Sequence, residues 1–249
     1  MSDHNPSSFR IGSVFHTTRW TMVIRARGAA PEARAALGDL CEAYWMPVYR
    51  FLKREGRSDD ESRELTQEFF SRLLAGNTLE KADPGKGRFR SYLLGALKHF
   101  LSDQRRAEGR LKRGGDVVIE SIDSGGGETS PGLSIADPGA GASDAYFDRH
   151  WALAVMERGL DAARESFNQS GKDKQFELLK PWLIGDVEGL SQADAAAELG
   201  MSAGAVKVAV HRLRQKFGEA IRREIAETVD TEDEIAGELR YLIDALQAH

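Results

Sequence analysis

The sequence contains a single cysteine, Cys41, among its 249 residues. One thiol cannot form an internal disulfide, so a disulfide-stapled fold is excluded and a reducing, cytoplasmic location is expected. No motif surrounds Cys41, and we interpret it as a small buried hydrophobe rather than a nucleophile. Apolar runs are short, and none approaches the roughly 18 residues that span a bilayer. The N-terminus lacks a basic stretch followed by an apolar block, so we expect no secretory signal and no membrane partner.

Catalytic and cofactor-binding motifs are missing as well. The sequence has no phosphate-binding Gly-Lys-Ser loop, no metal-spaced pair among its six histidines, and no Ser/His/Asp context. The glycine run at 125–128 lacks the flanking strand and helix that a nucleotide site requires. We therefore predict that the protein is not an enzyme and that it needs no metal and no cofactor.

Positive charge is scarce overall, because the formal net charge is -5, but it is concentrated in two places. Nine Lys or Arg and two acids lie between positions 86 and 113, and four basic residues and no acid lie between 202 and 217. Acidic segments at 114–148 and 224–249 flank these islands. This distribution is typical of a nucleic-acid-binding protein with solubilising linkers. Two solvated helix faces would give the same charge pattern.

Apolar side chains recur at helical spacing through most of the chain, and we predict an all-α fold. Residues 31–112 read as helices, with Pro31 at a helix start and Pro47 expected to kink or break the first of them. Ser58 is the expected N-cap of a helix that stops at Gly76. The helical pattern resumes at Asp144.

The segment between these helical parts has a different composition. Residues 114–143 contain eight glycines, two prolines and no basic residue, so they bury too little apolar surface to fold. We predict two small helical domains joined by this flexible, acidic, Gly-rich linker, and expect proteolysis to separate them. The predicted divisions are 1–113, the linker 114–143, a helix-turn-helix domain 144–223 and an acidic helical tail 224–249.

The most specific local motif is the stretch GLSQADAAAELGMSAGAVKVAVHRLRQKF. Ser191 and Ser202 are the expected N-caps of two helices, and Gly200 supplies the left-handed residue of the turn between them. The second helix has a predicted buried stripe of Val206, Val210, Leu213 and Phe217. Its cations then face outward, as in a recognition helix lying in the major groove. The same pattern also fits an antiparallel helix pair with exposed cations.

Two separated blocks of the sequence resemble the core domains of extracytoplasmic-function (ECF) sigma factors of bacterial RNA polymerase. The first runs from VYRFLKREGRSDDESRELTQEFFSRLLAG to GRFRSYLLGALKHFLSDQRR, and the second is the helix-turn-helix motif. The resemblance implies that the first block docks on polymerase and opens the −10 element, and that the second reads the −35 element. The implied partners are core RNA polymerase and promoter DNA.

The resemblance also implies roles for individual residues. The implied polymerase-binding residues are Glu61, Glu64, Leu65, Gln67, Glu68 and Phe69. The implied contacts to the separated −10 strand are Lys86, Arg88, Phe89, Arg90, Tyr92, Lys98, Arg105 and Arg106. The implied −35 contacts are Ser202, Lys207, His211, Arg212 and Arg214. Aromatic and cationic side chains suit stacking and phosphate tracking on single strands, although Phe89 and Tyr92 would serve equally well as core residues.

The sequence departs from the family's pattern at a few positions. Arg63 stands where the docking helix has an acid, and Val208 and Ala209 stand where Ser and Arg are common. A phosphate on Thr66, or less favourably on Ser62, would restore negative charge beside Arg63. The resemblance includes a kinase-linked subgroup, so a Ser/Thr kinase or an anti-sigma regulator is a further candidate partner. The alternative is that the remaining acids suffice and Thr66 is a surface hydroxyl.

Two functions fit these observations. The first is a sigma factor that binds core polymerase, directs it to specific promoters and starts strand opening. The second is a helix-turn-helix repressor or activator that binds duplex DNA. The second accounts for residues 189–217 but leaves the acidic and basic residues of 61–106 without a role.

Overall fold

The computed structural model describes residues 31–75, 88–112, 140–183, 185, 191–229 and 231–248. The predicted all-α class is confirmed, because every regular element in these ranges is helical. The elements are α2 (Pro31–Arg54), α3 (Asp59–Ala75), α4 (Phe89–Lys112), α5 (Ala140–Asn168), α6 (Asp173–Leu179), η3 (Lys180–Leu183), α7 (Gln192–Leu199), α8 (Ala203–Ala226) and α9 (Glu232–Gln247). Lys86, Gly76, the glycine run at 125–128 and most of the predicted linker lie outside the described residues.

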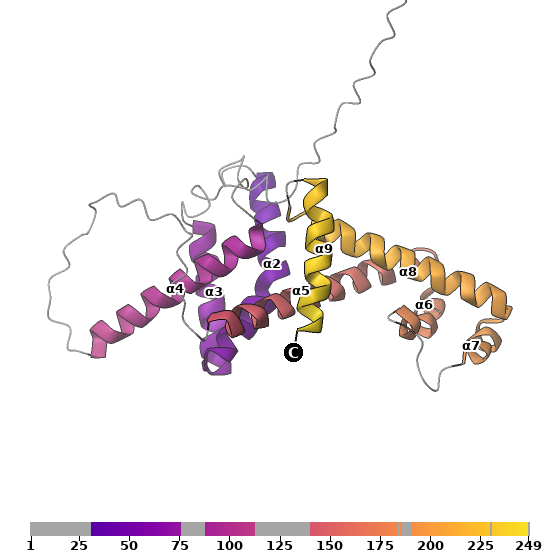
Figure 1. Ribbon diagram of the computed structural model, residues 1–249, viewed down its shortest axis with the longest axis horizontal. Helices are drawn as coiled ribbons and strands as arrows, with labels where there is room; N and C mark the ends of the chain where they lie inside the picture. Colours follow the sequence, from indigo (N-terminus) through magenta and orange to yellow (C-terminus); the bar gives the residue numbers. More distant parts are fainter. Residues whose placement is uncertain are drawn as a thin grey trace, which may run out of the picture.

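Helices α2, α3 and α4 form one end of the molecule (Figure 1). Pro31 begins α2 as predicted, and the helix continues through Pro47, where a break was one expected outcome. Ser58 precedes α3: its hydroxyl accepts a hydrogen bond from the Glu61 amide, and its own amide donates to the Glu61 carboxylate at 2.9 Å. This reciprocal pair is a capping box, which fixes where α3 starts.

Helix α5 connects this end of the molecule to the other. With 29 residues it is about 43 Å long, and it contacts α2 and α9 as well as α6 and α8 (Figure 1). A single hydrophobic core receives side chains from α2 to α5 and from α8 and α9, among them Leu40, Val48, Leu97, Trp151, Ile225 and Leu242. The two predicted domains share this core, so fragments cut within 114–143 would stay associated through it. Independent folding of the two parts stays a prediction.

A second core lies at the far end, where α6, η3 and α7 pack beneath the first half of α8 (Figure 1). Phe167 of α5 meets Phe176 of α6 with ring centroids 5.8 Å apart. Ala195 and Ala196 of α7 are buried against α8, and small side chains at these positions allow the two helices to approach closely. This core fixes the angle at which α8 leaves the body of the protein.

The predicted helical tail is the amphipathic helix α9, which lies across α5 and α8 (Figure 1). Ile235, Leu242 and Ala245 are buried in the shared core. The Arg149 guanidinium of α5 donates hydrogen bonds to the carbonyls of Leu246 and Ala248 at 3.1 and 2.7 Å. A cation there satisfies carbonyls that have no partner within the helix. Of the helices described, none is both long and apolar enough to cross a membrane.

Candidate nucleic-acid interface

The turn between α7 and α8 has the predicted N-cap hydrogen bonds and the predicted left-handed glycine. The Ser191 hydroxyl accepts a hydrogen bond from the Ala193 amide at 3.1 Å, and the Ser202 hydroxyl accepts one from the Ala205 amide at 3.2 Å. Gly200 adopts φ 63°, a left-handed conformation that a side chain would strain. The predicted caps and turn are therefore confirmed, and only three residues separate the two helices.

The outward face of α8 carries the residues implied for −35 contacts. Val206, Val210 and Leu213 are buried as predicted, and Phe217, the fourth residue of the predicted stripe, is half-buried and packs against both cores. Lys207, His211, Arg212 and Arg214 are exposed, and so is Ser202, whose hydroxyl is engaged in the cap. The Arg214 side chain also donates to the Trp182 carbonyl at 2.8 Å, which ties this cation to η3. Two positions of α8 depart from the family's pattern. Val208 is 51% exposed and lies on the outer surface, whereas Ala209 is buried.

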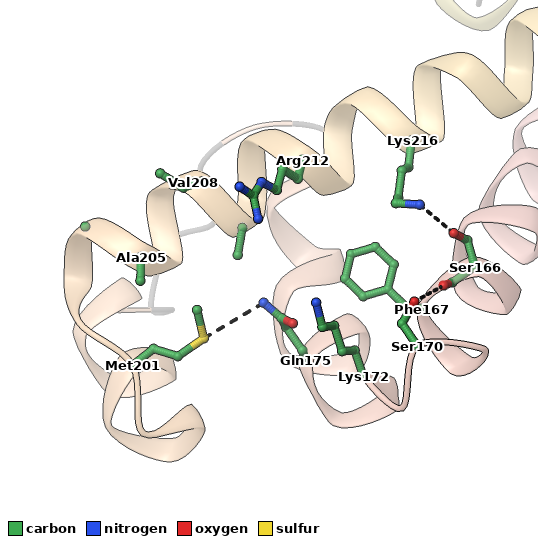
Figure 2. Close-up of a pocket in the computed structure, with 12 residues that line it drawn as sticks. Ser166, Phe167, Ser170, Lys172, Gln175, Met201, Ala205, Val208, Arg212 and Lys216 are labelled. Atoms are coloured by element: carbon green, nitrogen blue, oxygen red, sulfur yellow. Dashed lines mark hydrogen bonds between the residues drawn. The ribbon is translucent and has the colours of Figure 1, made fainter.

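A groove of about 660 Å³ runs beside α8, between it and the end of α5 with α6 (Figure 2). Lys172, Arg212 and Lys216 bring three cations to its wall. The Lys216 ammonium donates to the Ser166 hydroxyl at 2.6 Å, so this lysine is held at the rim. Sequence reasoning missed Lys172, because only the packing of α6 beside α8 brings it here.

The outer face of α3 carries most of the residues implied for polymerase binding. Glu61, Glu64 and Gln67 are exposed, and Leu65 and Glu68 are half-buried. The Glu68 carboxylate accepts hydrogen bonds from Arg72 at 2.5 Å and from Gln104 of α4 at 2.9 Å.

Phe69, also implied for polymerase binding, is in the core instead. It is 3% exposed and packs against Phe70 and Phe100 at 5.2 and 5.6 Å between ring centroids. Its ring lies on the inner face of α3 and does not reach the outer face of this helix. Leu74 is 51% exposed at the end of α3 and is an apolar surface residue that the sequence reasoning did not single out.

The two hydroxyls considered for phosphorylation are both buried. Thr66 and Ser62 are each 0% exposed, and the Thr66 hydroxyl donates to the Ser62 carbonyl at 2.6 Å. The expectation that Thr66 is an accessible hydroxyl is therefore wrong: the face of α3 that contains Thr66 packs inward. Arg63 is exposed and lies 3.8 Å from the Asp60 carboxylate, one turn earlier.

Three basic residues along α4 are paired with acids from within the chain. Lys98 lies 2.5 Å from Asp144 of α5, Arg105 lies 2.7 Å from Glu55, and Arg106 lies 3.3 Å from Asp103. Arg105 and Arg106 are exposed, and Lys98 and Tyr92 are half-buried. Exposed pairs of this kind contribute about 0–1 kcal/mol, so another anion can replace the partner acids at little cost.

Phe89 and Arg90 are buried, so in this structure neither meets DNA. Phe89 is 0% exposed and meets the Tyr44 ring edge-on at 5.1 Å, which makes it a core residue. Arg90 is 6% exposed. Phe89 packs against α2, whereas Arg90 is covered by Asp148 of α5 and by Glu238 and Tyr241 of α9.

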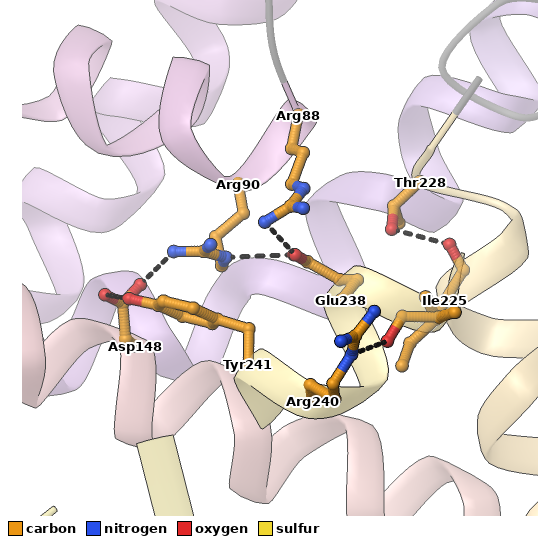
Figure 3. Close-up of polar contacts among 9 residues, drawn as sticks. Arg88, Arg90, Asp148, Ile225, Thr228, Glu238, Arg240 and Tyr241 are labelled. Carbon is orange, nitrogen blue, oxygen red and sulfur yellow. Dashed lines mark hydrogen bonds and ion pairs between the residues drawn. The ribbon is translucent and has the colours of Figure 1, made fainter. Parts of the chain in front are cut away.

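Arg90 lies at the centre of a buried ionic cluster (Figure 3). Its guanidinium donates to Glu238 of α9 at 3.1 Å and to Asp148 of α5. The guanidinium carbon also lies 4.1 Å from the Tyr241 ring centroid. Burial opposes ionisation of Arg90, but the two carboxylates outweigh it, so the pKa of Arg90 is raised.

Two further contacts complete this cluster. The Tyr241 hydroxyl donates to Asp148, and burial together with that hydrogen bond raises the pKa of Tyr241. Arg88 forms an ion pair at 2.7 Å with the second oxygen of Glu238, in a geometry that is not an aligned hydrogen bond.

The described residues contain no group of three or more His, Cys, Asp or Glu that could hold a metal ion. Burial raises the pKa of the Cys41 thiol to about 12, so almost no thiolate exists at neutral pH. This matches its interpretation as an apolar residue, because the thiolate is the reactive form.

The family model and the curated relative that match this chain are both described as ECF sigma factors. A family model described as "ECF sigma factor" matches residues 46–223. The ECF RNA polymerase sigma factor SigE of Mycolicibacterium smegmatis is 24% identical over 184 residues, which is 74% of this chain and 61% of that protein. The chain therefore spans less than two thirds of that relative's length. No solved structure gives a significant match.

Proposed function

Since the chain belongs to the ECF sigma factor family, we propose that it binds core RNA polymerase, directs it to specific promoters and starts strand opening. The observation that carries this proposal is the extent of the family match, which runs from within α2 to within α8 and includes both candidate interfaces. Sigma factors are generally not enzymes, and we propose that this one acts in the cytoplasm without catalysis or a cofactor.

We propose that different helices of the chain bind polymerase, the −35 duplex and the separated −10 strand. The acidic outer face of α3, with Glu61, Glu64 and Gln67, docks on polymerase. The outer face of α8, with Lys207 and Arg212, contacts the −35 duplex, because a helix of this diameter fits the major groove. The cations of α4 follow the separated −10 strand.

Co-purification separates this proposal from a helix-turn-helix repressor or activator. A tagged full-length chain should retain core polymerase, and replacing Glu61 and Glu64 by glutamine should weaken retention because the docking face loses two charges. Glu219→Gln, an exposed acid on α8, is the matched control and should bind like the wild type. Stable duplex binding with no retention of polymerase would favour the repressor or activator.

Replacing Lys207 by alanine should weaken promoter binding by the holoenzyme. The expected loss is about 1–3 kcal/mol for a base contact, or a salt dependence reduced by about one ion for a phosphate contact. Fluorescence anisotropy with labelled promoter DNA over a salt series distinguishes the two. Arg222→Ala is the control, because this exposed cation lies about 22 Å further along α8. Equal binding by Lys207→Ala and wild type would show that this face does not contact DNA.

Arg214→Ala should also weaken promoter binding, but it has a second effect. The side chain donates to the Trp182 carbonyl, so its removal leaves that carbonyl without this donor. We expect a small loss of stability, about 1 kcal/mol, together with weaker binding. A thermal melt recorded beside the binding assay separates the two contributions.

Because the Thr66 hydroxyl is buried, we expect a negative charge at this position to destabilise the folded protein. Thr66→Glu should lower the free energy of unfolding by several kcal/mol, because the carboxylate would be buried without a partner. Thr66→Val should remain folded and active. Denaturant unfolding and transcription assays check both variants. Full activity and stability of Thr66→Glu would contradict the buried position.

A kinase or an anti-sigma protein stays a proposed regulator of this chain. A kinase would act on a hydroxyl other than those of Thr66 and Ser62, because both are inaccessible in the folded protein. An anti-sigma protein would compete with polymerase for the exposed face of α3.

A further inference from the structure

The cations at the start of α4 are occupied by carboxylates from α5 and α9. Arg88 and Arg90 share Glu238, and Arg90 also binds Asp148 (Figure 3). Arg90 is one of the α4 cations to which the proposed function gives the separated strand, and the family resemblance implies the same role for Arg88, which directly precedes α4. A carboxylate and a phosphate present the same charge and the same kind of acceptor oxygens to a guanidinium. Glu238 therefore offers these two arginines the same kind of acceptor that a nucleic-acid phosphate would offer.

Glu238 is an unusual residue for the inner face of a helix. It is 1% exposed and lies on the same face as Ile235 and Leu242, both buried. Burying a carboxylate is costly unless it is paired, and a buried ion pair adds little net stability over a hydrophobic contact. Apolar side chains in place of Glu238 and its arginine partners together would therefore hold α9 as well. What the carboxylate adds is recognition of the two arginines, and this recognition is open to competition from another anion.

The position of α9 in the chain supports a separate role for this helix. The family match ends at residue 223, whereas α9 begins at Glu232. The contacts that hold α9 are its buried apolar side chains, Glu238 on Arg88 and Arg90, the Tyr241 hydroxyl on Asp148, and the Arg149 guanidinium on the last carbonyls. Its departure would leave the contacts of α5 with α2 and with α8 in place.

We propose that α9 is an autoinhibitory helix, which covers the start of α4 with Glu238 in place of a DNA phosphate and must leave before the separated promoter strand binds. This inference rests on the proposed function. It predicts that polymerase and DNA together displace α9, and that weakening the Glu238 contacts makes strand binding easier.

Hydrogen–deuterium exchange on the full-length chain tests the displacement. We expect the amides of 232–247 to exchange roughly tenfold faster in the complex with core polymerase and a fork-junction DNA than in the free chain. The amides of α7 should be unchanged or slower, because the corner stays folded on DNA. Unchanged or slower exchange in α9 would overturn the proposal, because α9 would then remain docked in the bound state.

Glu238→Gln gives the second arm of the test, with Asp244→Asn as the matched control. Both variants remove one negative charge from α9, but Asp244 is exposed and does not contact the arginines. In the holoenzyme, Glu238→Gln should bind a single-stranded −10 probe several-fold more tightly than wild type or Asp244→Asn. Equal affinity of the three chains, with the variant folded by circular dichroism, would overturn the proposal.

The remaining outcomes are also decisive. If Glu238→Gln unfolds, the exchange experiment on the wild-type chain decides alone, and Tyr241→Phe provides a milder weakening of α9 docking, because it removes the hydroxyl that donates to Asp148. If the wild-type chain fails to bind polymerase, both the proposed function and the autoinhibitory role fail. If it binds polymerase and DNA while α9 stays protected, only the autoinhibitory role fails.

Discussion

Replacing Arg90 by alanine should lower the free energy of unfolding by about 3–5 kcal/mol, because it leaves buried Asp148 without its cation and leaves buried Glu238 with Arg88 alone. Asp148 and Glu238 are 6% and 1% exposed, so water cannot replace the guanidinium. The variant also loses the stacking of Arg90 on Trp151 and Tyr241, at 4.9 and 4.1 Å. For a chain of this size, the melting temperature should fall by roughly 6–20 °C, measured by calorimetry.

The control for this prediction is Arg106→Ala, which removes the same side chain type from the same helix. Arg106 pairs with Asp103 at the surface, where both side chains are mostly exposed. Its loss should cost less than about 1 kcal/mol. Equal, small losses for the two variants would show that the carboxylates are solvated and that α9 does not close over α4.

Replacing Gly159 by leucine should disrupt the crossing of α5 and α8, which joins the two ends of the molecule. A Cβ at position 159 would lie 2.8 Å from Cγ1 of Ile221 and 3.5 Å from the Ile221 amide nitrogen. Overpacking of this kind costs about 1–3 kcal/mol or more. Combining it with Ile221→Ala should cost less than the sum of the two single changes, because the smaller side chain makes room.

Gly218→Leu is the matched control for the crossing. A Cβ on Gly218 of α8 would meet no atom within 4 Å. Removing an unconstrained glycine from a helix should raise stability by up to about 1 kcal/mol. Chemical denaturation of the wild type and the four variants checks the pattern. Strict additivity of Gly159→Leu and Ile221→Ala would contradict the close approach.

Local features could be read from the sequence because they depend on neighbouring residues. The N-caps Ser58, Ser191 and Ser202 and the left-handed Gly200 depend on hydrogen bonds within one or two turns. The buried stripe of α8 follows from helical periodicity alone. The caps, the turn and three of the four stripe positions are confirmed, and they are sufficient to place the outward cations of α8.

The burial of Arg90 and Thr66 could not be read in this way, because it depends on helices distant in the sequence, whereas a core position of Phe89 was one of the two readings that the sequence left open. Glu238 lies 148 positions after Arg90 in the chain, and a charge pattern does not say which acid meets which base. One signal was available: a carboxylate with Ile235 and Leu242 on the same helical face predicts a buried partner of opposite charge.

The acidic segments also have a role that composition alone does not reveal. Asp144 and Asp148 belong to the segment that was interpreted as solubilising, yet both pair with cations of α4. The basic island at 86–113 is therefore partly neutralised within the folded chain. Its availability to DNA depends on whether these intramolecular acids can be displaced.

Transcription by core RNA polymerase on a pool of genomic fragments, with and without this chain, tests the proposed function most directly. Sequencing the 5′ ends of the transcripts should show a limited set of start sites that appear only when the chain is present. Those sites should share −35 and −10 elements, and Lys207→Ala should reduce their use. Transcripts that are the same with and without the chain, or initiation that is only repressed by it, would contradict the account.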